Sequence, residues 1–101
     1  MITPPGHSPV DKMGASFDVV LFPNPADDLL NVRVRSYELR TTHSDLNFAM
    51  FDIFGKVVLL RNFDTAGRLE LDVSGLLGGV YFAVVRDVLT GEIVVEKVVV
   101  E

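Results

Sequence analysis

The sequence contains no cysteine and no tryptophan among its 101 residues. The absence of cysteine excludes disulfides, cysteine nucleophiles and thiolate metal sites. It does not fix the compartment, because a domain with an adequate core can work outside the cytoplasm without disulfides. The sequence also lacks a long apolar run, since its longest uncharged stretch, Val73–Val85, is shorter than the roughly 18 residues of a membrane helix and is interrupted by glycines.

Basic charge is scarce. Nine Lys and Arg stand against 14 Asp and Glu, which gives a net charge of −5. The basic residues are scattered and form no run that could neutralise phosphates, so nucleic acid and anionic membrane surfaces are disfavoured as partners. Hydrophobic residues make up 49% of the chain and are interleaved with charges, which is typical of one core-rich domain.

The chain divides into a linker and a domain. Residues 1–16 are rich in proline and show no periodicity, and we expect them to link the domain to an upstream cargo domain in the same chain. Residues 17–101 carry the strand patterns and form the expected C-terminal domain.

Apolar residues in the domain recur with period 2 or as short continuous runs between turn signals, and no window has sustained helical spacing. The pattern predicts about seven strands and an all-β, antiparallel sandwich. The expected strands are Asp18–Phe22, Leu30–Arg35, Leu46–Met50, Lys56–Arg61, Arg68–Val73, Val80–Arg86 and Glu92–Val100.

The strand patterns also predict which residues face the core. Leu30, Val32 and Val34 alternate with polar residues and should point inward. We further expect the phenylalanines within strand patterns to be buried, namely Phe22, Phe48, Phe51 and Phe82. Val80–Arg86 is apolar on both faces, as in a central strand. β-branched residues continue to Val100, which predicts that the C-terminus is paired into a sheet.

Turn chemistry accounts for most of the other distinctive residues. We interpret Pro23-Asn24-Pro25 as a rigid corner that ends the first strand, with direct recognition by a partner as the alternative. The remaining turn and strand-entry residues are interpreted first as fold devices: Asp52 and Gly55 in a hairpin, Gly79 and Tyr81 at a strand entry, and Gly91 in the last turn.

Four blocks of sequence resemble the type IX secretion C-terminal sorting domains of Bacteroidetes. They are Leu21–Asp28 (LFPNPADD), Met50–Val58 (MFDIFGKVV), Leu71–Phe82 (LDVSGLLGGVYF) and Lys97–Val100 (KVVV), in the family's order and near its spacing. The match departs from the family at Leu77, which stands in place of the usual proline.

The resemblance implies a seven-stranded immunoglobulin-like sandwich and a non-catalytic role. Such domains direct a parent protein through the type IX translocon across the outer membrane. A sortase-like cysteine protease then removes them, often attaching the cargo to an anionic lipopolysaccharide. The expected path leads through the periplasm to the outer membrane surface or the extracellular space.

Two segments are candidates for that role. Lys97, Val98, Val99 and Val100 are the expected recognition strand, which the translocon could contact directly or through strand addition at its edge. An unprotected edge would also make a homodimer plausible. Met13, Gly14, Ala15 and Ser16 form the expected cleavage region, an extended segment in which Gly14, Ala15 and Ser16 have small side chains.

Other functions find less support in the sequence. His43-Ser44-Asp45 holds the residue types of a catalytic triad, but neighbours in an extended chain point to opposite sides. The two histidines lack zinc spacing, and no glycine pattern fits a phosphate. We therefore expect no enzyme activity, no cofactor and no metal. The alternative is an accessory immunoglobulin-like module that binds carbohydrate or protein, although the chain offers few aromatic residues for sugar binding.

Overall fold

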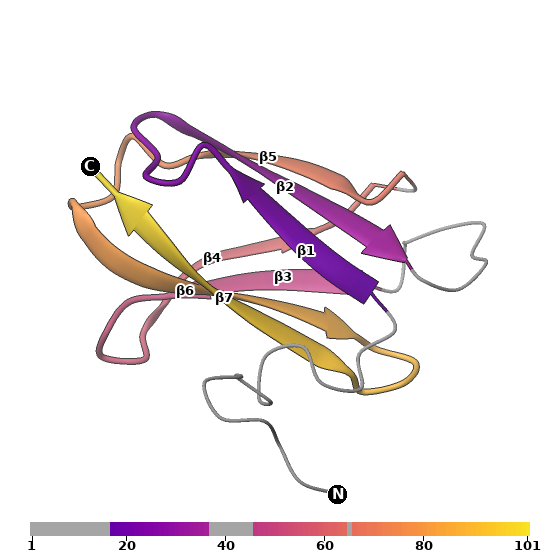
Figure 1. The fold of residues 1–101 in the computed structure, drawn as a ribbon. Coiled ribbons are helices and arrows are strands. Elements are labelled where there is room, and N and C mark those ends of the chain that lie inside the picture. Colours follow the sequence, from indigo (N-terminus) through magenta and orange to yellow (C-terminus); the bar gives the residue numbers. More distant parts are fainter. Residues whose placement is uncertain (1–16, 37–45, 65) are drawn as a thin grey trace, which may run out of the picture.

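The computed structural model describes residues 17–36, 46–64 and 66–101, which form two antiparallel β-sheets packed face to face (Figure 1). The linker 1–16, the cleavage region within it and His43-Ser44-Asp45 lie outside the described residues. The described residues contain seven strands and no helix, and thus no helix that could span a membrane. The all-β prediction is confirmed.

The strands divide into one sheet of three and one of four. The three-stranded sheet has the order β1-β2-β5 and the four-stranded sheet the order β4-β3-β6-β7. The strand bounds are β1 Phe17–Phe22, β2 Leu29–Ser36, β3 Leu46–Phe51, β4 Val57–Asn62, β5 Arg68–Asp72, β6 Gly79–Asp87 and β7 Ile93–Val100.

The core lies between the sheets and is built by alternate residues of each strand. Leu30, Val32 and Val34 of β2 are buried as predicted, because side chains two residues apart share one face of a strand. The buried hydrophobic residues are Phe17, Val19, Ala26, Leu30, Val32, Val34, Leu46, Phe48, Met50, Phe63, Leu71, Val73, Tyr81, Ala83, Val85, Val94, Val98 and Val100.

The prediction for the phenylalanines was only partly right. Phe48 is buried and Phe51 is half-buried, but Phe22 and Phe82 are each 39% exposed. Side chains alternate between the two faces of a strand. Phe22 lies three positions from the buried Val19, and Phe82 lies next to the buried Ala83, so both phenylalanines point outward. β6 is a central strand as predicted, yet apolar residues on its outer face are exposed.

The β3–β4 hairpin turns on Asp52. Its carboxylate accepts the backbone N–H groups of Phe54 and Lys56, both at 2.9 Å. The Asp52 carbonyl accepts the N–H of Gly55 at 3.0 Å, and Gly55 takes a φ of 84°. A side chain at that φ is strained, which explains why glycine stands there.

Two glycines form the entry to β6, where space is tight at the first and the backbone conformation is unusual at the second. A Cβ on Gly78 would lie 3.3 Å from the backbone oxygen of Val100, and Gly79 has a φ of 154°. Two residues on, the Tyr81 hydroxyl donates a hydrogen bond to the Leu77 carbonyl. This bond holds the turn against the strand that follows it, much as the tyrosine corner does in immunoglobulin-like sandwiches.

Replacing Tyr81 with Phe should lower the free energy of unfolding by about 1 kcal/mol, the net value of one hydrogen bond. Tyr81→Ala should cost about 3–5 kcal/mol because it also empties a core site. Urea unfolding of the three proteins measures both effects. Equal stability of Tyr81→Phe and the unaltered protein would show that the hydroxyl does not hold the turn.

Candidate functional site at the C-terminal strand

The candidate recognition segment, Lys97–Val100, is the second half of β7. It pairs along its whole length with β6, with Val98 opposite Tyr81 and Lys97 opposite Phe82. Val98 and Val100 are 0% and 2% exposed, whereas Lys97 is exposed and Val99 is half-buried on the outer face. Two of the four candidate side chains are therefore core residues, and only Lys97 and Val99 are presented outward.

The Pro23–Ala26 corner is hydrogen-bonded to the outer edge of this segment. The Asn24 amide nitrogen donates to the Lys97 carbonyl, and the Val99 N–H donates to Asn24 Oδ1, both at 2.9 Å. Ala26 continues the ladder with two backbone bonds of 2.8 Å, donating to the Val99 carbonyl and accepting from the N–H of Glu101. We call these four bonds the corner clip.

The local sequence suits the corner clip. Neither flanking proline has an N–H to donate, so the Asn24 side chain supplies the donor that an ordinary strand would supply from its backbone. Both Phe22–Pro23 and Asn24–Pro25 peptide bonds are cis. Ala26 is completely buried and forms a parallel bridge with Val100. Its small side chain lets the corner approach the terminal strand.

The corner clip bears on the idea of strand addition. On the edge of β7 that faces away from β6, the backbone groups of Lys97, Val99 and Glu101 already have hydrogen-bond partners in the corner. A strand from another protein could pair there only after displacing the corner. Among the described residues, β1, β4 and β5 are the other strands with an edge that no strand covers. Homodimerisation through an edge stays a prediction.

The fold gathers some of the family-motif residues and disperses others. Pro23, Asn24 and Pro25 lie against β7, and Gly79 and Tyr81 are register partners of Val100 and Val98. Asp52 and Gly55 lie in the β3–β4 turn, and Gly91, with a φ of 78°, lies in the β6–β7 turn at the far end of β7. Sequence reasoning missed the contact between Asn24 and β7; an asparagine between two prolines indicates a corner but not which strand lies beside it.

Asp72 and Ser74 shape the turn after β5. The Asp72 carboxylate accepts the Ser74 hydroxyl at 2.6 Å and the Ser74 backbone N–H at 3.0 Å. These two hydrogen bonds lower the pKa of Asp72 from its ordinary value, the hydroxyl bond contributing most. The pKa shift of Asp72 is a consequence of the turn geometry.

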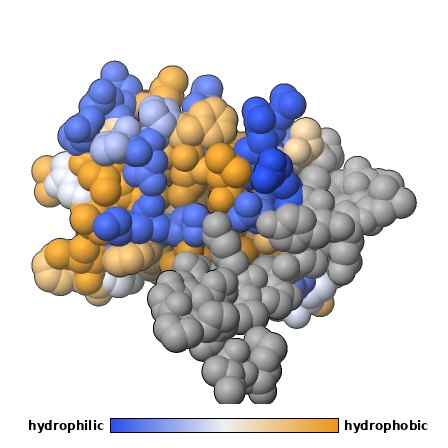
Figure 2. All heavy atoms as spheres, viewed as in Figure 1, coloured by the Kyte–Doolittle hydropathy of each residue, from blue (hydrophilic) through white to orange (hydrophobic). Residues whose placement is uncertain are grey.

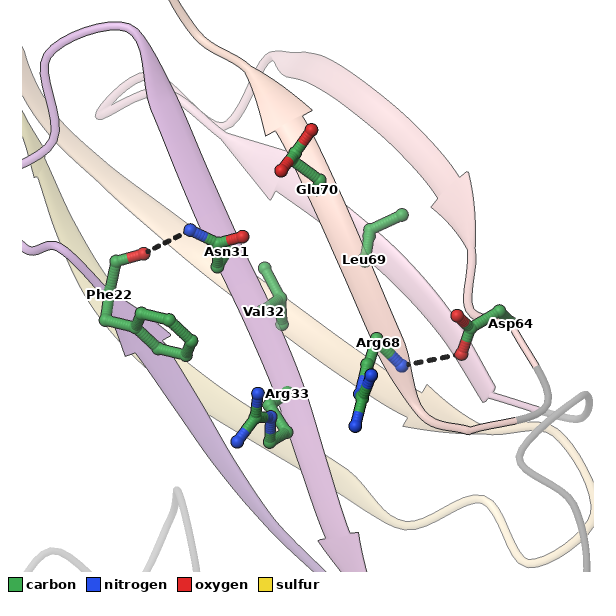
Figure 3. Close-up of a pocket in the computed structure, with 8 residues that line it drawn as sticks. All are labelled: Phe22, Asn31, Val32, Arg33, Asp64, Arg68, Leu69 and Glu70. Atoms are coloured by element: carbon green, nitrogen blue, oxygen red, sulfur yellow. Dashed lines mark hydrogen bonds between the residues drawn. The ribbon is translucent and has the colours of Figure 1, made fainter.

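A surface hollow of about 240 Å³ lies over the outer face of the three-stranded sheet (Figure 3). The Arg33 guanidinium stands 5.6 Å from the centre of the Phe22 ring, and Asp64 accepts the backbone N–H of Arg68 at 2.8 Å. Phe22, Asp64 and Arg68 are thus engaged with neighbours in the sheet or its turn. Nowhere in the described ranges do three or more His, Cys, Asp or Glu gather to hold a metal ion.

Solved structures with the same fold show an immunoglobulin-like β-sandwich. The chain resembles part of PorZ, a type IX secretion component of Porphyromonas gingivalis, with 15% identity over 82% of this chain and a TM-score of 0.65. It resembles part of dimeric latent PorU from the same organism with 24% identity over 83% and a TM-score of 0.57. The chain spans only 11% and 9% of those two proteins.

A third structure covers nearly the same length. It is a DUF3244 protein from Bacteroides vulgatus with an immunoglobulin-like β-sandwich fold, 11% identical over 84% of this chain and 94% of that one, with a TM-score of 0.58. These identities support the fold alone. No curated protein sequence shows significant similarity to the chain.

The class is therefore an immunoglobulin-like β-sandwich. Residues 20–101 match the family of secretion system C-terminal sorting domains, and the chain belongs to this family, whose system is type IX secretion. The role of the domain is accordingly in protein sorting for export to the cell surface or the extracellular space.

Replacing Asn24 with Ala should lower the free energy of unfolding by about 1–2 kcal/mol, because two hydrogen bonds are lost. Asn24→Asp should lower the free energy of unfolding by less, since its carboxylate can still accept the Val99 N–H. Hydrogen exchange at the Val99 amide should accelerate in Asn24→Ala. The matched control is Asn31→Ala, which removes one bond of 3.2 Å between adjacent strands. Equal exchange at Val99 in both variants would contradict the corner clip.

Proposed function

We propose that this domain is a non-catalytic C-terminal secretion signal that the type IX translocon recognises on a parent protein. The translocon binds the folded C-terminal end of β7, and the cargo is the upstream domain in the same chain. The observation that carries the proposal is the family match over residues 20–101, together with the presentation of Lys97 beside the corner clip.

The burial of β7 supports recognition through side chains. Val98 and Val100 hold the strand in the core, and the corner clip occupies the edge backbone groups of Lys97, Val99 and Glu101. Lys97 and Val99 are left to meet a partner, flanked by their register neighbours Phe82 and Val80 on β6. A lysine at the end of an exposed apolar row offers one directed charge contact with hydrophobic contact around it.

Removal of the domain completes the proposal. A sortase-like cysteine protease cuts the linker within Met13-Gly14-Ala15-Ser16, where Gly14, Ala15 and Ser16 have the small side chains that suit a narrow active site. The cut precedes Phe17, the first residue of β1, so the sandwich leaves intact. In this scheme the parent passes through the periplasm, and its cargo ends at the outer membrane surface or in the medium.

Replacing Lys97 with Glu should reduce export at least about tenfold, because a reversed charge repels the acidic group that the lysine meets. The full chain is fused behind a reporter that carries a Sec signal and is expressed in a host with an intact type IX system. Surface and periplasmic reporter are then quantified. Lys56→Glu is the matched control, since Lys56 is also an exposed lysine but lies in the β3–β4 turn.

A point substitution is preferable to a truncation here. Deleting Lys97–Glu101 should retain the cargo in the periplasm, but it also removes the buried Val98 and Val100 side chains. Lys97 is exposed, so its substitution leaves the core intact. Equal export of Lys97→Glu and Lys56→Glu would refute recognition through Lys97.

Mass spectrometry of the exported reporter should find its new C-terminus within Ser8–Ser16. Replacing Gly14-Ala15 with two bulky residues should slow the cut, because a narrow active site excludes them, and should leave full-length fusion in the envelope. The same replacement at Gly6-His7 serves as the control. A cut after Phe17, inside the sandwich, would contradict the proposed removal.

A further inference from the structure

The outer face of the four-stranded sheet is unusual because it is mainly apolar, with Asn47, Asn62, Arg86 and Lys97 at its polar positions. Antiparallel sheets commonly pack one face on the core and solvate the other with polar residues. Here the outward positions of β3, β4, β6 and β7 are occupied mainly by Ala49, Phe51, Leu60, Val80, Phe82, Val84, Ile93, Val95 and Val99. We call this set the apolar outer face.

The register of the strands makes the apolar outer face continuous. Leu60, Ala49, Val84 and Val95 form one row across the sheet. Phe51, Phe82 and Lys97 form the next row. Several of these side chains remain accessible, with Phe82 39%, Ile93 45% and Leu60 63% exposed.

A hollow of about 340 Å³ lies in this face, lined by Ala49, Phe51, Leu60, Val84, Arg86 and Ile93 among others. Its cause is the small side chain of Ala49 among larger neighbours on all four strands. Such a hollow can receive one apolar side chain of a partner, and buried anchors of that kind supply much of the affinity of protein interfaces.

The outer face of the three-stranded sheet provides the contrast. Its outward positions include Asp18, Arg33, Arg35, Arg68 and Glu70, which are charges of both signs. Seen from the side of β1 and β7, hydrophilic and hydrophobic residues are mixed (Figure 2). The two outer faces of one sandwich therefore differ in kind, and only the polar one is an ordinary solvated surface.

Charge indicates which partner the apolar outer face meets. The charged residues at its outward strand positions are Arg86 and Lys97, and no carboxylate occupies such a position in the described strands, although the whole chain carries a net charge of −5. A second copy packed face to face would bring two further cations, and no carboxylate at an outward strand position, into the interface. An anionic lipid surface would repel the acidic body of the domain. A protein surface with apolar residues and carboxylates would complement both the apolar side chains of the face and the cations Arg86 and Lys97.

We infer that the apolar outer face is the docking surface for a protein partner whose own surface is apolar and edged by carboxylates, with one partner side chain seated in the hollow beside Ala49. The inference rests on the proposed function and deepens it, because Lys97 belongs to the same face. The translocon contact then extends from Lys97 across β6 to β3 and β4.

The test compares two double variants of equal chemistry in the full-chain reporter fusion. Phe82→Gln with Ile93→Gln alters the apolar outer face, and Phe22→Gln with Leu29→Gln alters the opposite sheet at residues of matched exposure: 39% and 45% against 39% and 47%. Surface delivery should fall at least about tenfold in the first variant and stay within about twofold in the second. Circular dichroism and thermal unfolding confirm that both remain folded.

Two charge-reversal variants test the role of the cations on the apolar outer face. Arg86→Glu should reduce delivery at least about threefold, because it repels the partner's carboxylates. Arg33→Glu makes the same charge change on the polar outer face and should leave delivery unchanged. Equal effects of the two substitutions would overturn the charge argument.

The outcomes separate the two proposals. If the unaltered fusion stays in the periplasm, the proposed function fails and this inference fails with it. If the unaltered fusion and the Phe82/Ile93 variant are exported equally, or if both double variants lose export equally, only this inference fails.

Two further measurements test other occupants of the face. If the wild-type domain forms a dimer in analytical ultracentrifugation and the Phe82/Ile93 variant is monomeric, the occupant is a second copy. Flotation with phosphatidylglycerol vesicles that the same variant abolishes would identify a membrane. Either result would overturn the protein partner.

Discussion

The corner clip is the constraint on which the C-terminal half of β7 depends. It joins Asn24, just after β1 of the three-stranded sheet, to Lys97 and Val99 in β7 of the four-stranded sheet. A terminal strand with one neighbour usually frays from its open side. Here one side of Lys97–Val100 is paired with β6 and the other with the corner, so the last residues have the ordered environment of an interior strand.

The corner clip makes the signal a property of the whole fold. Asn24 and Lys97 are 73 residues apart, so their contact closes a long loop and depends on the fold of the strands between them. In the folded structure Val98 and Val100 are core residues. Recognition of Lys97 on a folded β7 would therefore report that the domain is complete, which a short linear motif at the terminus cannot do.

The sequence predicted the strands well because side-chain alternation records which face of each strand is buried. The phase of Leu30, Val32 and Val34 identified the inner face of β2 without knowledge of its partners. Turn chemistry likewise located the hairpin at Asp52 and Gly55, because few residues tolerate a φ of 84°.

Two features could not be predicted from the same signals. The contact of Asn24 with β7 depends on which strand lies beside the corner, and a pattern along one segment carries no information about that neighbour. The exposure of Phe82 was missed for a different reason. An apolar residue in the outward phase of a strand looks the same whether a further layer covers it or not, so a place within an apolar strand pattern did not reveal that Phe82 and Phe22 are exposed.

The distribution of charge adds direction to the proposed docking. An acidic body repels an acidic partner from most approaches, while Arg86 and Lys97 attract it to the apolar outer face. Because screening limits such attraction to about 8 Å at physiological salt, the two cations act only on carboxylates that are nearly in contact. In the proposed complex the two cations favour one orientation of the encounter, and the apolar rows of the face supply the affinity once the orientation is right. In this proposal the net charge opposes self-association through the face, and the two cations favour a partner of complementary charge.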